Sequence, residues 1–549
     1  MLNSNLRQVA LIDGYLDEPS CLGVPPYISP QIRYVYGALL DAGLTPDQIL
    51  YRTIDQVRSN WELAAEILGR MDEVIIIAGA TVPGRYLGGR PISSREIGQI
   101  RELTTSGPLI LGGPIVLTGE DLPSADIVCD EIAATSIFAH FTGGSVPIDT
   151  DGNQWASAIN RWAVLGAALT TKHPNYPYVV CELETYRGCP RAHNCAFCTE
   201  ARKRVHYTRP VTDIVAEVAE LYRLGNRYFR LGCQTDLFLY NAHRRGKELL
   251  INASAIEELY QGVREAAPEL KLLHMDNANP ATLMRQPDVA AKAISTIAAY
   301  NTAGDVAAFG LESADPKVLA ANLVETSPEE TFEAVRLMNE FGGWREGGIP
   351  KLLPGINLIH GLLGETKETM ELNYQWLLRL LDSGLMVRRI NIRQVLPHGN
   401  YRGSKVPQHR FQAYKDKINK EINRPMLQRV FPWGTVLEGV IIEEVRGKVS
   451  FGRQLGSYPI LVGVPGEYAL GEILTVRVID HGYRSITALP TPFNINRASV
   501  AQLEALPGMG RKRATQVFLA QPIAGPAELE AILGRDFDWG PLLPWITFE

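Results

Sequence analysis

The sequence predicts an α/β protein built from several domains. Its 549 residues leave room for three or four domains, and a hydrophobic content of 46% is ample for ordinary cores. Between residues 175 and 400, apolar strand-like runs alternate with amphipathic stretches of helical period, which is typical of βαβ units and a parallel sheet. After residue 430 the pattern changes to short β runs, and the chain ends in a helical segment.

Residues 1–150 are expected to form a separate α/β domain. Strand-like runs occur at 9–12, 73–77 and 108–111, and each ends near a glycine. Buried strands that end at glycine and are separated by helix-length segments predict a Rossmann-like sheet.

Residues 175–400 are predicted to form a partial (β/α)6 barrel. A helix over 211–224 places Ile214, Val218 and Leu221 on one face, and a strand over 228–232 follows it. The next strand, 270–275, runs into the polar segment 276–280. In barrels of this kind the C-terminal ends of the strands carry the chemistry.

Three cysteines lie close together where this barrel begins. Cys189, Cys195 and Cys198 fall within ten residues, in a chain that has seven cysteines. Soft thiolates select iron–sulfur centres, and three of them leave one iron of a 4Fe-4S cluster without a protein ligand. A tetrahedral zinc site made by these cysteines and His193 is the alternative.

Three further segments give a family resemblance. Phe197 precedes the last cysteine, the segment 309–319 reads FGLESADPKVL, and the segment 356–366 reads INLIHGLLGET. Together with the cysteines, these segments resemble the radical S-adenosylmethionine (SAM) superfamily, although the cysteine spacing is five and two where three and two is usual. The resemblance implies a 4Fe-4S cluster that binds SAM, and an external electron donor such as flavodoxin or ferredoxin. Reductive cleavage of SAM would then release a 5'-deoxyadenosyl radical.

The resemblance also implies which residues meet the cofactors. The cluster ligands are Cys189, Cys195 and Cys198. The residues expected near SAM are Phe197, Gly232, Asn277, Glu312, Ser313, Gly361 and Glu365. Cys233 follows a barrel strand, and packing is the role that we favour for it over that of a radical or methyl acceptor.

The N-terminal domain bears on two further cofactors. Its segments 28–33, 85–93 and 111–114 resemble the N-terminal domain of cobalamin-dependent radical enzymes, but no Asp-x-His-x-x-Gly follows the first strand. Cobalamin is therefore not favoured. Methylthiotransferases hold a second cluster on three cysteines of the corresponding domain. Here only Cys21 and Cys129 lie in it, so a second cluster is not supported.

Residues 401–425 are expected to form a basic helical linker. Tyr401, Phe411 and Tyr414 alternate with seven lysines and arginines, as a surface that pairs with phosphates and stacks on bases would require. A solvated helix face is the alternative.

Two small modules are expected to follow. Residues 430–490 carry short β runs at 435–442, 459–464 and 473–479, and they resemble the OB-like TRAM barrel, which binds tRNA in methylthiotransferases. Residues 494–549 resemble a helix-hairpin-helix, in which Ser499 caps the first helix and 507–510 form the hairpin. The nucleic-acid contacts expected there are Gly508, Gly510, Arg511, Lys512 and Arg513.

The favoured function is a radical SAM enzyme that modifies RNA, either tRNA or rRNA. One alternative is a methyl- or methylthio-transferring radical enzyme that acts on a protein or a small molecule, and another is a zinc-stabilised RNA-binding protein. A net charge of −6 gives no general attraction to nucleic acid, so binding must be local. No apolar run long enough for a membrane span occurs, and a cytoplasmic location, where thiols stay reduced, is expected.

Overall fold

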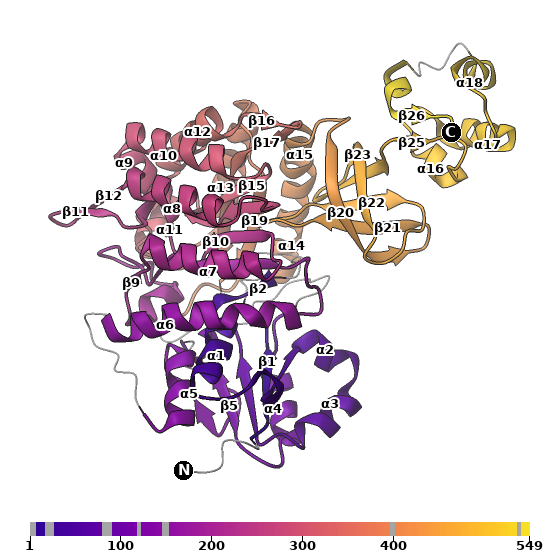
Figure 1. The fold of residues 1–549 in the computed structure, drawn as a ribbon. Helices are drawn as coiled ribbons and strands as arrows, with labels where there is room; N and C mark the ends of the chain where they lie inside the picture. The colour runs from indigo at the N-terminus through magenta and orange to yellow at the C-terminus, as the bar shows by residue number, and fades with distance from the viewer. Residues whose placement is uncertain are drawn as a thin grey trace. The chain divides into compact units, whose positions relative to one another are not determined.

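The computed structural model describes residues 7–16, 27–79, 90–117, 122–144, 153–395, 401–534 and 540–549 (Figure 1). The chain divides into two compact units. Unit 1 contains residues 1–344, 351–411 and 456–458, and unit 2 contains residues 345–350, 412–455 and 459–549.

Unit 1 begins with a parallel five-stranded sheet in the order β3-β1-β4-β5-β6. Its strands are β1 (Val9–Asp13), β3 (Ile49–Thr53), β4 (Glu73–Ile77), β5 (Leu109–Gly112) and β6 (Ile127–Val128). Its helices are α1 (Pro30–Asp41), α2 (Ile54–Ser59), α3 (Trp61–Leu68), α4 (Ser94–Leu103) and α5 (Ala133–Thr142). The three strands expected from the sequence are present. Strands β1 and β4 are buried along their whole length, and the strand order is that of a doubly wound α/β fold.

The second part of unit 1 has six successive parallel strand positions. They are β7 (Val180–Glu184), β10 (Tyr228–Gly232), β13 (Leu272–Met275) continued by β14 (Asn277–Ala278), β15 (Asp305–Glu312), β18 (Leu352–His360) and β19 (Arg389–Gln394). They form two sheets, β13-β10-β7-β2 and β14-β15-β18-β19. The short strand β2 (Tyr27–Ile28) comes from the N-terminal region and pairs with β7.

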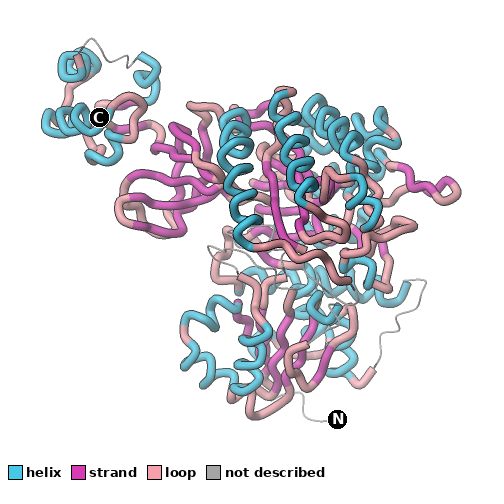
Figure 2. Tube along the Cα trace, turned by 180° about the vertical axis from the view of Figure 1, so that it is seen from behind, coloured by secondary structure: helices cyan, strands magenta, loops and turns pink. Residues whose placement is uncertain are grey.

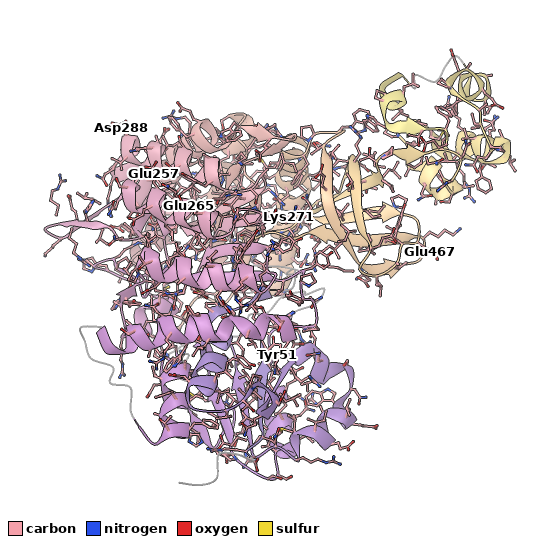
Figure 3. All side chains as sticks on the ribbon, in the orientation of Figure 1. Tyr51, Glu257, Glu265, Lys271, Asp288 and Glu467 are labelled. Atoms are coloured by element: carbon pink, nitrogen blue, oxygen red, sulfur yellow. The ribbon has the colours of Figure 1, made fainter. Side chains whose placement is uncertain are left out.

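Helices connect these strands, as βαβ units require. They are α7 (Val211–Arg223), α8 (Ala253–Ala266), α9 (Pro280–Arg285), α10 (Pro287–Tyr300), α11 (Pro316–Ala321), α12 (Pro328–Gly342) and α13 (Lys367–Asp382), with α6 (Asn153–Gly166) before β7. The helix and strand predicted at 211–224 and 228–232 are confirmed. The charged residues labelled on α8 and α10 in Figure 3, Glu257, Glu265 and Asp288, are exposed, whereas the apolar face of α7 is buried.

Helices α1 and α6 cross closely because both carry a glycine at the crossing. A Cβ on Gly37 would lie 2.2 Å from the Trp162 carbonyl oxygen, and a Cβ on Gly166 would lie 1.9 Å from the Arg33 carbonyl oxygen. This contact fixes the N-terminal domain against the helix that leads into β7.

A helical region joins the barrel of unit 1 to the modules of unit 2. It contains α14 (Gln408–Ile418), a π-helical turn (Asn419–Asn423) and α15 (Arg424–Val430). Tyr401, Phe411 and Tyr414 are all buried. The expectation that these three aromatic side chains form a base-stacking surface is therefore wrong, because they pack inside the protein, whereas the exposed positions between them are polar, charged or small.

Unit 2 contains a closed five-stranded barrel, visible from behind in Figure 2. Its strands are β20 (Val436–Arg446), β21 (Val449–Gln454), β22 (Leu461–Pro465), β23 (Ile473–His481) and β24 (Ser485–Pro490), in the order β20-β21-β22-β24-β23. Strands β20, β22 and β23 correspond to the β runs expected at 435–442, 459–464 and 473–479.

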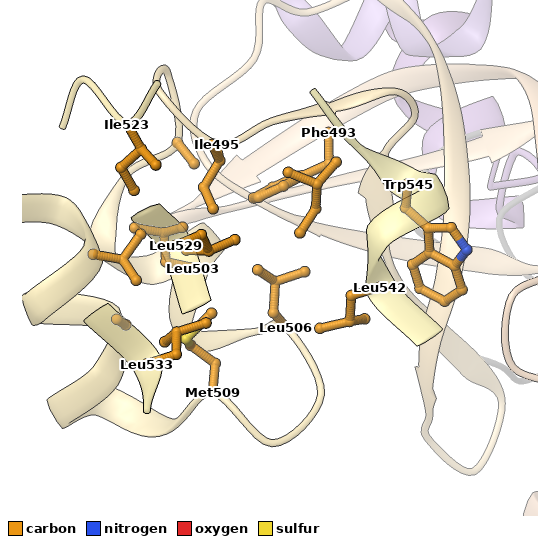
Figure 4. Close-up of a cluster of buried hydrophobic side chains, with 14 of the residues drawn as sticks. Phe493, Ile495, Leu503, Leu506, Met509, Ile523, Leu529, Leu533, Leu542 and Trp545 are labelled. Carbon is orange, nitrogen blue, oxygen red and sulfur yellow. The ribbon is translucent and has the colours of Figure 1, made fainter. Parts of the chain in front are cut away.

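The C-terminal module has its own core (Figure 4). Its helices are α16 (Val500–Glu504), α17 (Gly510–Ala520) and α18 (Pro526–Leu533), beside the short strand pair β25 (Phe493–Asn494) and β26 (Ile546–Thr547). Leu503, Leu506, Met509 and Val517 are buried in this core. Ser499 accepts a hydrogen bond from the Gln502 backbone, and the Gln502 side chain accepts one from the Ser499 backbone, which caps α16.

Among the described residues, no helix is both long and apolar enough to cross a membrane.

Candidate active site

The three cysteines lie on a loop whose base is pinned by backbone pairing. Strand β8 (Tyr186–Arg187) precedes the loop and pairs antiparallel with β9 (Tyr207–Thr208), which follows it. Because β8 comes directly after β7, the loop begins at the C-terminal end of the first barrel strand. This is the end at which barrel enzymes carry their chemistry.

The three thiols are free and act on one another. Burial raises the pKa of Cys195 to about 11, where Glu312 adds to the effect and Arg191 opposes it. Burial likewise raises the pKa of Cys198 to about 12, and Glu200 and the other two thiols add to it. The thiols therefore share one small region of the loop.

This donor set fits an iron–sulfur cluster better than a single metal ion. Within the described part of the chain, no group of three or more His, Cys, Asp or Glu side chains is arranged to hold a metal ion, and the Cys3His zinc site that would include His193 stays an untested alternative. In a cubane cluster each thiolate binds a different iron, and the sulfurs stay further apart than around one zinc. Three soft, free thiols on one loop supply the donors that such a cluster requires.

A hydrogen bond and a small hydrophobic cluster hold the loop on the barrel. The Ala196 N–H donates to the Asn322 carbonyl oxygen at 2.9 Å. Phe197 packs against Val318, Leu362 and Tyr401. Asn322 follows α11 and Leu362 follows β18, so the loop rests on the ends of two barrel units that are distant in the sequence. The contacts found for Phe197 are with the side chains of this hydrophobic cluster.

Glu312 ends β15 beside the thiols. Its backbone has a φ of 65°, and the β15–β18 register shifts between Gly310 and Glu312. A non-glycine residue in this region is strained, and such strain is common where a side chain must be aimed at a ligand. Glu312 acts electrostatically on Cys195, which places its carboxylate at the cluster loop.

Ser313, the next residue, is directed elsewhere. Its side chain is fully buried, and its hydroxyl lies 3.4 Å from the Asn373 side-chain oxygen of α13. The Asp315 N–H also donates to this hydroxyl. These contacts give Ser313 a role in the turn that starts α11, and its contact with SAM stays a prediction.

The turn after β18 is closed by its own glutamate. His360 Nδ1 lies 2.7 Å from a Glu365 carboxylate oxygen, and the Gly361 N–H donates to the other oxygen. Gly361 has a φ of 87°, and its carbonyl oxygen accepts a hydrogen bond from the Ser404 N–H at 2.7 Å. The close backbone approach at Gly361 is therefore to residues 403–404.

Gly232 and Asn277 lie on neighbouring strand ends. A Cβ on Gly232 would lie 2.2 Å from a Glu182 carboxylate oxygen, so that carboxylate occupies the space next to the glycine. The Asn277 side chain donates to the Gln234 carbonyl oxygen at 3.0 Å and so braces the turn after β10.

Buried ion pairs line the same region, and the sequence interpretation missed them. Arg230 lies 2.6 Å from Glu182, and Arg187 lies 2.9 Å from Glu184. Burial raises the pKa of the adjacent Cys233 thiol well above its usual value, and Glu182 and Glu184 add to the effect. The alternation of glutamate with apolar residues in β7 was the signal, because charged residues at every second position of a buried strand must share one face.

The N-terminal domain touches the cysteine loop. The Arg202 guanidinium donates to the Leu117 carbonyl oxygen at 2.7 Å, and the Arg204 N–H donates to the Glu131 carboxylate at 2.7 Å. Leu117 and Glu131 follow β5 and β6, so the C-terminal edge of this sheet meets the loop. Of the residues considered for other cofactors there, Cys129 is buried, and Cys21 and residues 85–89 lie outside the described residues.

The hairpin of unit 2 presents the expected groups to solvent. Gly508, Gly510, Arg511 and Lys512 are exposed. Arg513 is partly exposed, and its guanidinium donates to the Gly508 carbonyl oxygen at 3.1 Å. Arg511 and Lys512 are therefore the two cations that this hairpin presents most openly.

The comparison with protein families decides the identity of the barrel. The family model of the radical SAM superfamily matches residues 183–377, which includes all three cysteines and Glu312. Residues 183–377 are therefore a radical SAM domain. This domain implies a 4Fe-4S cluster and SAM, and it supports an enzymatic function.

Two curated proteins match this chain almost end to end. An uncharacterized protein of Archaeoglobus fulgidus is 40% identical over 547 residues, covering 96% of this chain and 98% of the relative. An uncharacterized protein of Methanocaldococcus jannaschii is 40% identical over 511 residues, covering 88% of this chain and 93% of the relative.

Solved structures are more distant. The radical SAM methyltransferase TsrM from Kitasatospora setae is 16% identical, with a TM-score of 0.45 over 71% of this chain and 73% of TsrM. The cobalamin-dependent radical enzyme OxsB is 14% identical, with a TM-score of 0.47 over 76% of this chain and 56% of OxsB. At these TM-scores neither likeness carries an argument about the reaction.

Proposed function

We propose that this radical SAM protein reductively cleaves SAM and modifies an RNA, either tRNA or rRNA. The observation that carries the first part is the loop of three free, mutually interacting thiols next to Glu312. The second part rests on the hairpin of unit 2, whose glycines and cations are exposed.

In this proposal Cys189, Cys195 and Cys198 hold the cluster, and Glu312 and Asn277 line the space for SAM. When bound, the cluster and SAM supply a 5'-deoxyadenosyl radical, and a flavodoxin or ferredoxin supplies the electron. The buried pairs Glu182–Arg230 and Glu184–Arg187 keep the polar interior of the barrel in a fixed arrangement. Cobalamin is left out, because no histidine of the expected motif follows β1.

A second group of cations in unit 2 supports RNA docking. Lys415 of α14 lies close enough to Arg484 for the two charges to repel each other: burial, and then Arg484, lower the pKa of Lys415. The neighbouring Tyr483 is exposed. Cations held near one another beside an exposed aromatic ring favour a phosphate-bearing partner.

The cluster assignment is tested by replacing all three cysteines with alanine. The variant is expected to lose its iron and to stop releasing 5'-deoxyadenosine under dithionite. Cys129→Ala, which removes a buried thiol of the N-terminal domain, is the matched control and should retain both. Continued release of 5'-deoxyadenosine by the triple variant would overturn the central claim.

RNA recruitment is tested at the hairpin. Replacing Arg511 and Lys512 with alanine should weaken binding to total tRNA or rRNA and reduce the salt dependence by about one unit of slope for each lost phosphate contact. Uncoupled SAM cleavage should not change. The control removes two exposed cations of unit 1, Arg244 and Lys247, and should bind RNA as the wild type does.

A methyl- or methylthio-transferring enzyme acting on a protein or a small molecule is the second candidate. The contact of the N-terminal sheet edge with the cysteine loop favours it, because ligands of doubly wound sheets bind at that edge. If the wild-type protein shows no salt-sensitive binding to tRNA or rRNA, this candidate is the better conclusion.

A further inference from the structure

A buried arginine lies inside the long cysteine spacing. Arg191 is the second of the five residues between Cys189 and Cys195, and its side chain is 15% exposed. Its Nε is buried and has no hydrogen-bond partner within the described part of the chain. Buried nitrogen donors are almost always paired, so this N–H group needs an acceptor that the described residues do not provide.

The other end of this guanidinium faces a fixed carboxylate. Arg191 Nη2 lies 4.0 Å from Asp236 Oδ2, and Asp236 is fully buried. Asp236 accepts hydrogen bonds from the Thr282 hydroxyl at 2.7 Å and from the Phe238 N–H at 3.2 Å. Asp236 is thus held in place by its neighbours, and it anchors Arg191 from the side.

The charge of Arg191 also acts on two of the three thiols. The electrostatic partners of its guanidinium include Cys189 and Cys195 as well as Asp236. Interactions in a buried site are screened much less than in water. A permanent positive charge is therefore aimed at the place where the cluster sulfurs would lie.

We propose that Arg191 is a positioning residue that raises the reduction potential of the cluster on Cys189, Cys195 and Cys198, and that Asp236 moderates its charge. This inference rests on the proposed function, because it requires the cluster. One electron from an external low-potential donor adds one negative charge to the site, and a nearby guanidinium favours that added charge. Net charge and hydrogen bonds to the sulfurs are general determinants of such potentials. Neither side chain gains or loses a proton in this step.

The test is a potentiometric titration of the reconstituted full-length protein, followed by electron paramagnetic resonance. Arg191→Gln keeps a polar, hydrogen-bonding side chain, although a shorter one, and removes its charge, so it should make the potential more negative. The expected shift is about tenfold in the reduction equilibrium, or about 59 mV for one electron. Asp236→Asn should shift the potential in the opposite direction, and Arg191→Lys should lie between wild type and Arg191→Gln.

The control is Arg223→Gln, which removes an exposed positive charge from α7 and should leave the potential unchanged. An unshifted potential in Arg191→Gln, with full iron content, overturns the inference. If Arg191→Gln does not retain a cluster, Asp236→Asn decides, and an unshifted potential there overturns it as well. A wild-type protein that assembles no cluster would instead refute the proposed function itself.

Discussion

Loss of the Glu217 carboxylate is expected to destabilise unit 1 strongly. Glu217 of α7 forms ion pairs with Arg33 of α1 and with Arg209, and all three side chains are fully buried. Arg33 also donates to the Glu182 carbonyl oxygen, and Arg209 donates to the Glu184 carbonyl oxygen at 3.2 Å. One carboxylate therefore neutralises two guanidiniums that join the N-terminal domain to the first barrel strand.

The magnitude follows from what the substitution leaves behind. Glu217→Gln has nearly the same shape but leaves two buried positive charges without a counter-ion. Breaking a buried ion pair by removing one partner costs about 3–5 kcal/mol, and two stranded arginines place this site at the upper end. Burial alone would raise the pKa of Glu217, but the two arginines outweigh it and lower this pKa, so the carboxylate is ionised at neutral pH. The contribution of Glu217 to the free energy of unfolding is fully present above the pKa that this residue has in the unfolded state. It is lost as the pH falls through the lowered pKa of the folded state.

Urea unfolding at pH 7.5, followed by tryptophan fluorescence, measures the effect. Replacing Glu220, which forms an exposed pair with Arg223 on the same helix, is the matched control and should leave the unfolding midpoint unchanged. A triple variant that combines Arg33→Met, Glu217→Leu and Arg209→Met should recover most of the loss, because no buried charge of the triad then remains. A Glu217→Gln protein as stable as the wild type would refute the reasoning.

Three further substitutions test other parts of unit 1. Burial raises the pKa of Asp13 to about 6 from the ordinary 3.8, although hydrogen bonds from the Tyr15 N–H and the Tyr51 hydroxyl oppose this shift (Tyr51 is labelled in Figure 3). The ionised carboxylate therefore destabilises the folded state at high pH. Asp13→Asn should raise the free energy of unfolding by about 3 kcal/mol at pH 8 and by nearly nothing at pH 4. A stability gain that does not depend on pH would contradict this. Gly361→Ala should cost about 2 kcal/mol, because a residue with positive φ is strained and the new Cβ would lie 3.0 Å from the Ser404 carbonyl oxygen. Gly384 also has a positive φ of 80°, but a Cβ there would have no atom within 4 Å, so Gly384→Ala should lower the free energy of unfolding by less. Thermal unfolding of both variants measures the difference. Glu312→Ala should weaken SAM binding about tenfold (about 1.4 kcal/mol) in an anaerobic titration, with the iron content unchanged, and an unaltered dissociation constant would exclude a direct contact.

The barrel could be predicted because its strands differ strongly from their surroundings. Tyr228–Gly232 and Leu272–Met275 are mostly apolar runs, of which the first ends at a glycine and the second is followed by Asp276, and the helices between them have one apolar face. Burial on both faces of a parallel sheet demands this pattern, so the sequence shows it directly. The cysteine loop was equally clear, because three thiols in ten residues have few other uses.

The prediction for the aromatic residues after the barrel was wrong because it relied on the composition of this segment and not on the spacing of its apolar residues. Phe411, Tyr414, Ile418 and Ile422 are separated by three, four and four residues, which places them on one helical face, and all four are buried. Arg410, Lys415 and Lys417 occupy other positions of α14, together with glutamines and Asp416. The aromatic and charged residues that suggested base stacking are those of an amphipathic helix, which their helical spacing shows.

The direction of individual site side chains could not be predicted at all. Glu312 and Ser313 are adjacent in a strand end that matches the superfamily, yet the Glu312 carboxylate acts electrostatically on Cys195, whereas the Ser313 hydroxyl contacts Asn373. Adjacent residues of a strand point to opposite faces. A sequence motif therefore identifies two neighbouring residues, and the local backbone conformation determines which of the two side chains reaches the site. The left-handed φ of Glu312 makes even this alternation irregular.

The cysteine loop depends on contacts from four separate parts of the chain. Its base is paired by β8 and β9, its centre is bonded to Asn322, Phe197 packs on residues that follow β15 and β18, and Arg202 reaches Leu117 in the N-terminal domain. None of these partners lies within the loop itself, and each belongs to an element of the surrounding barrel or N-terminal domain. Since a ligand loop must be held by its surroundings before three thiolates can meet one cluster, the N-terminal domain and the barrel act together as its scaffold. Substitutions at the Arg33–Glu217–Arg209 triad, none of whose residues belongs to the cysteine loop, should therefore reach the cluster through the position of β7.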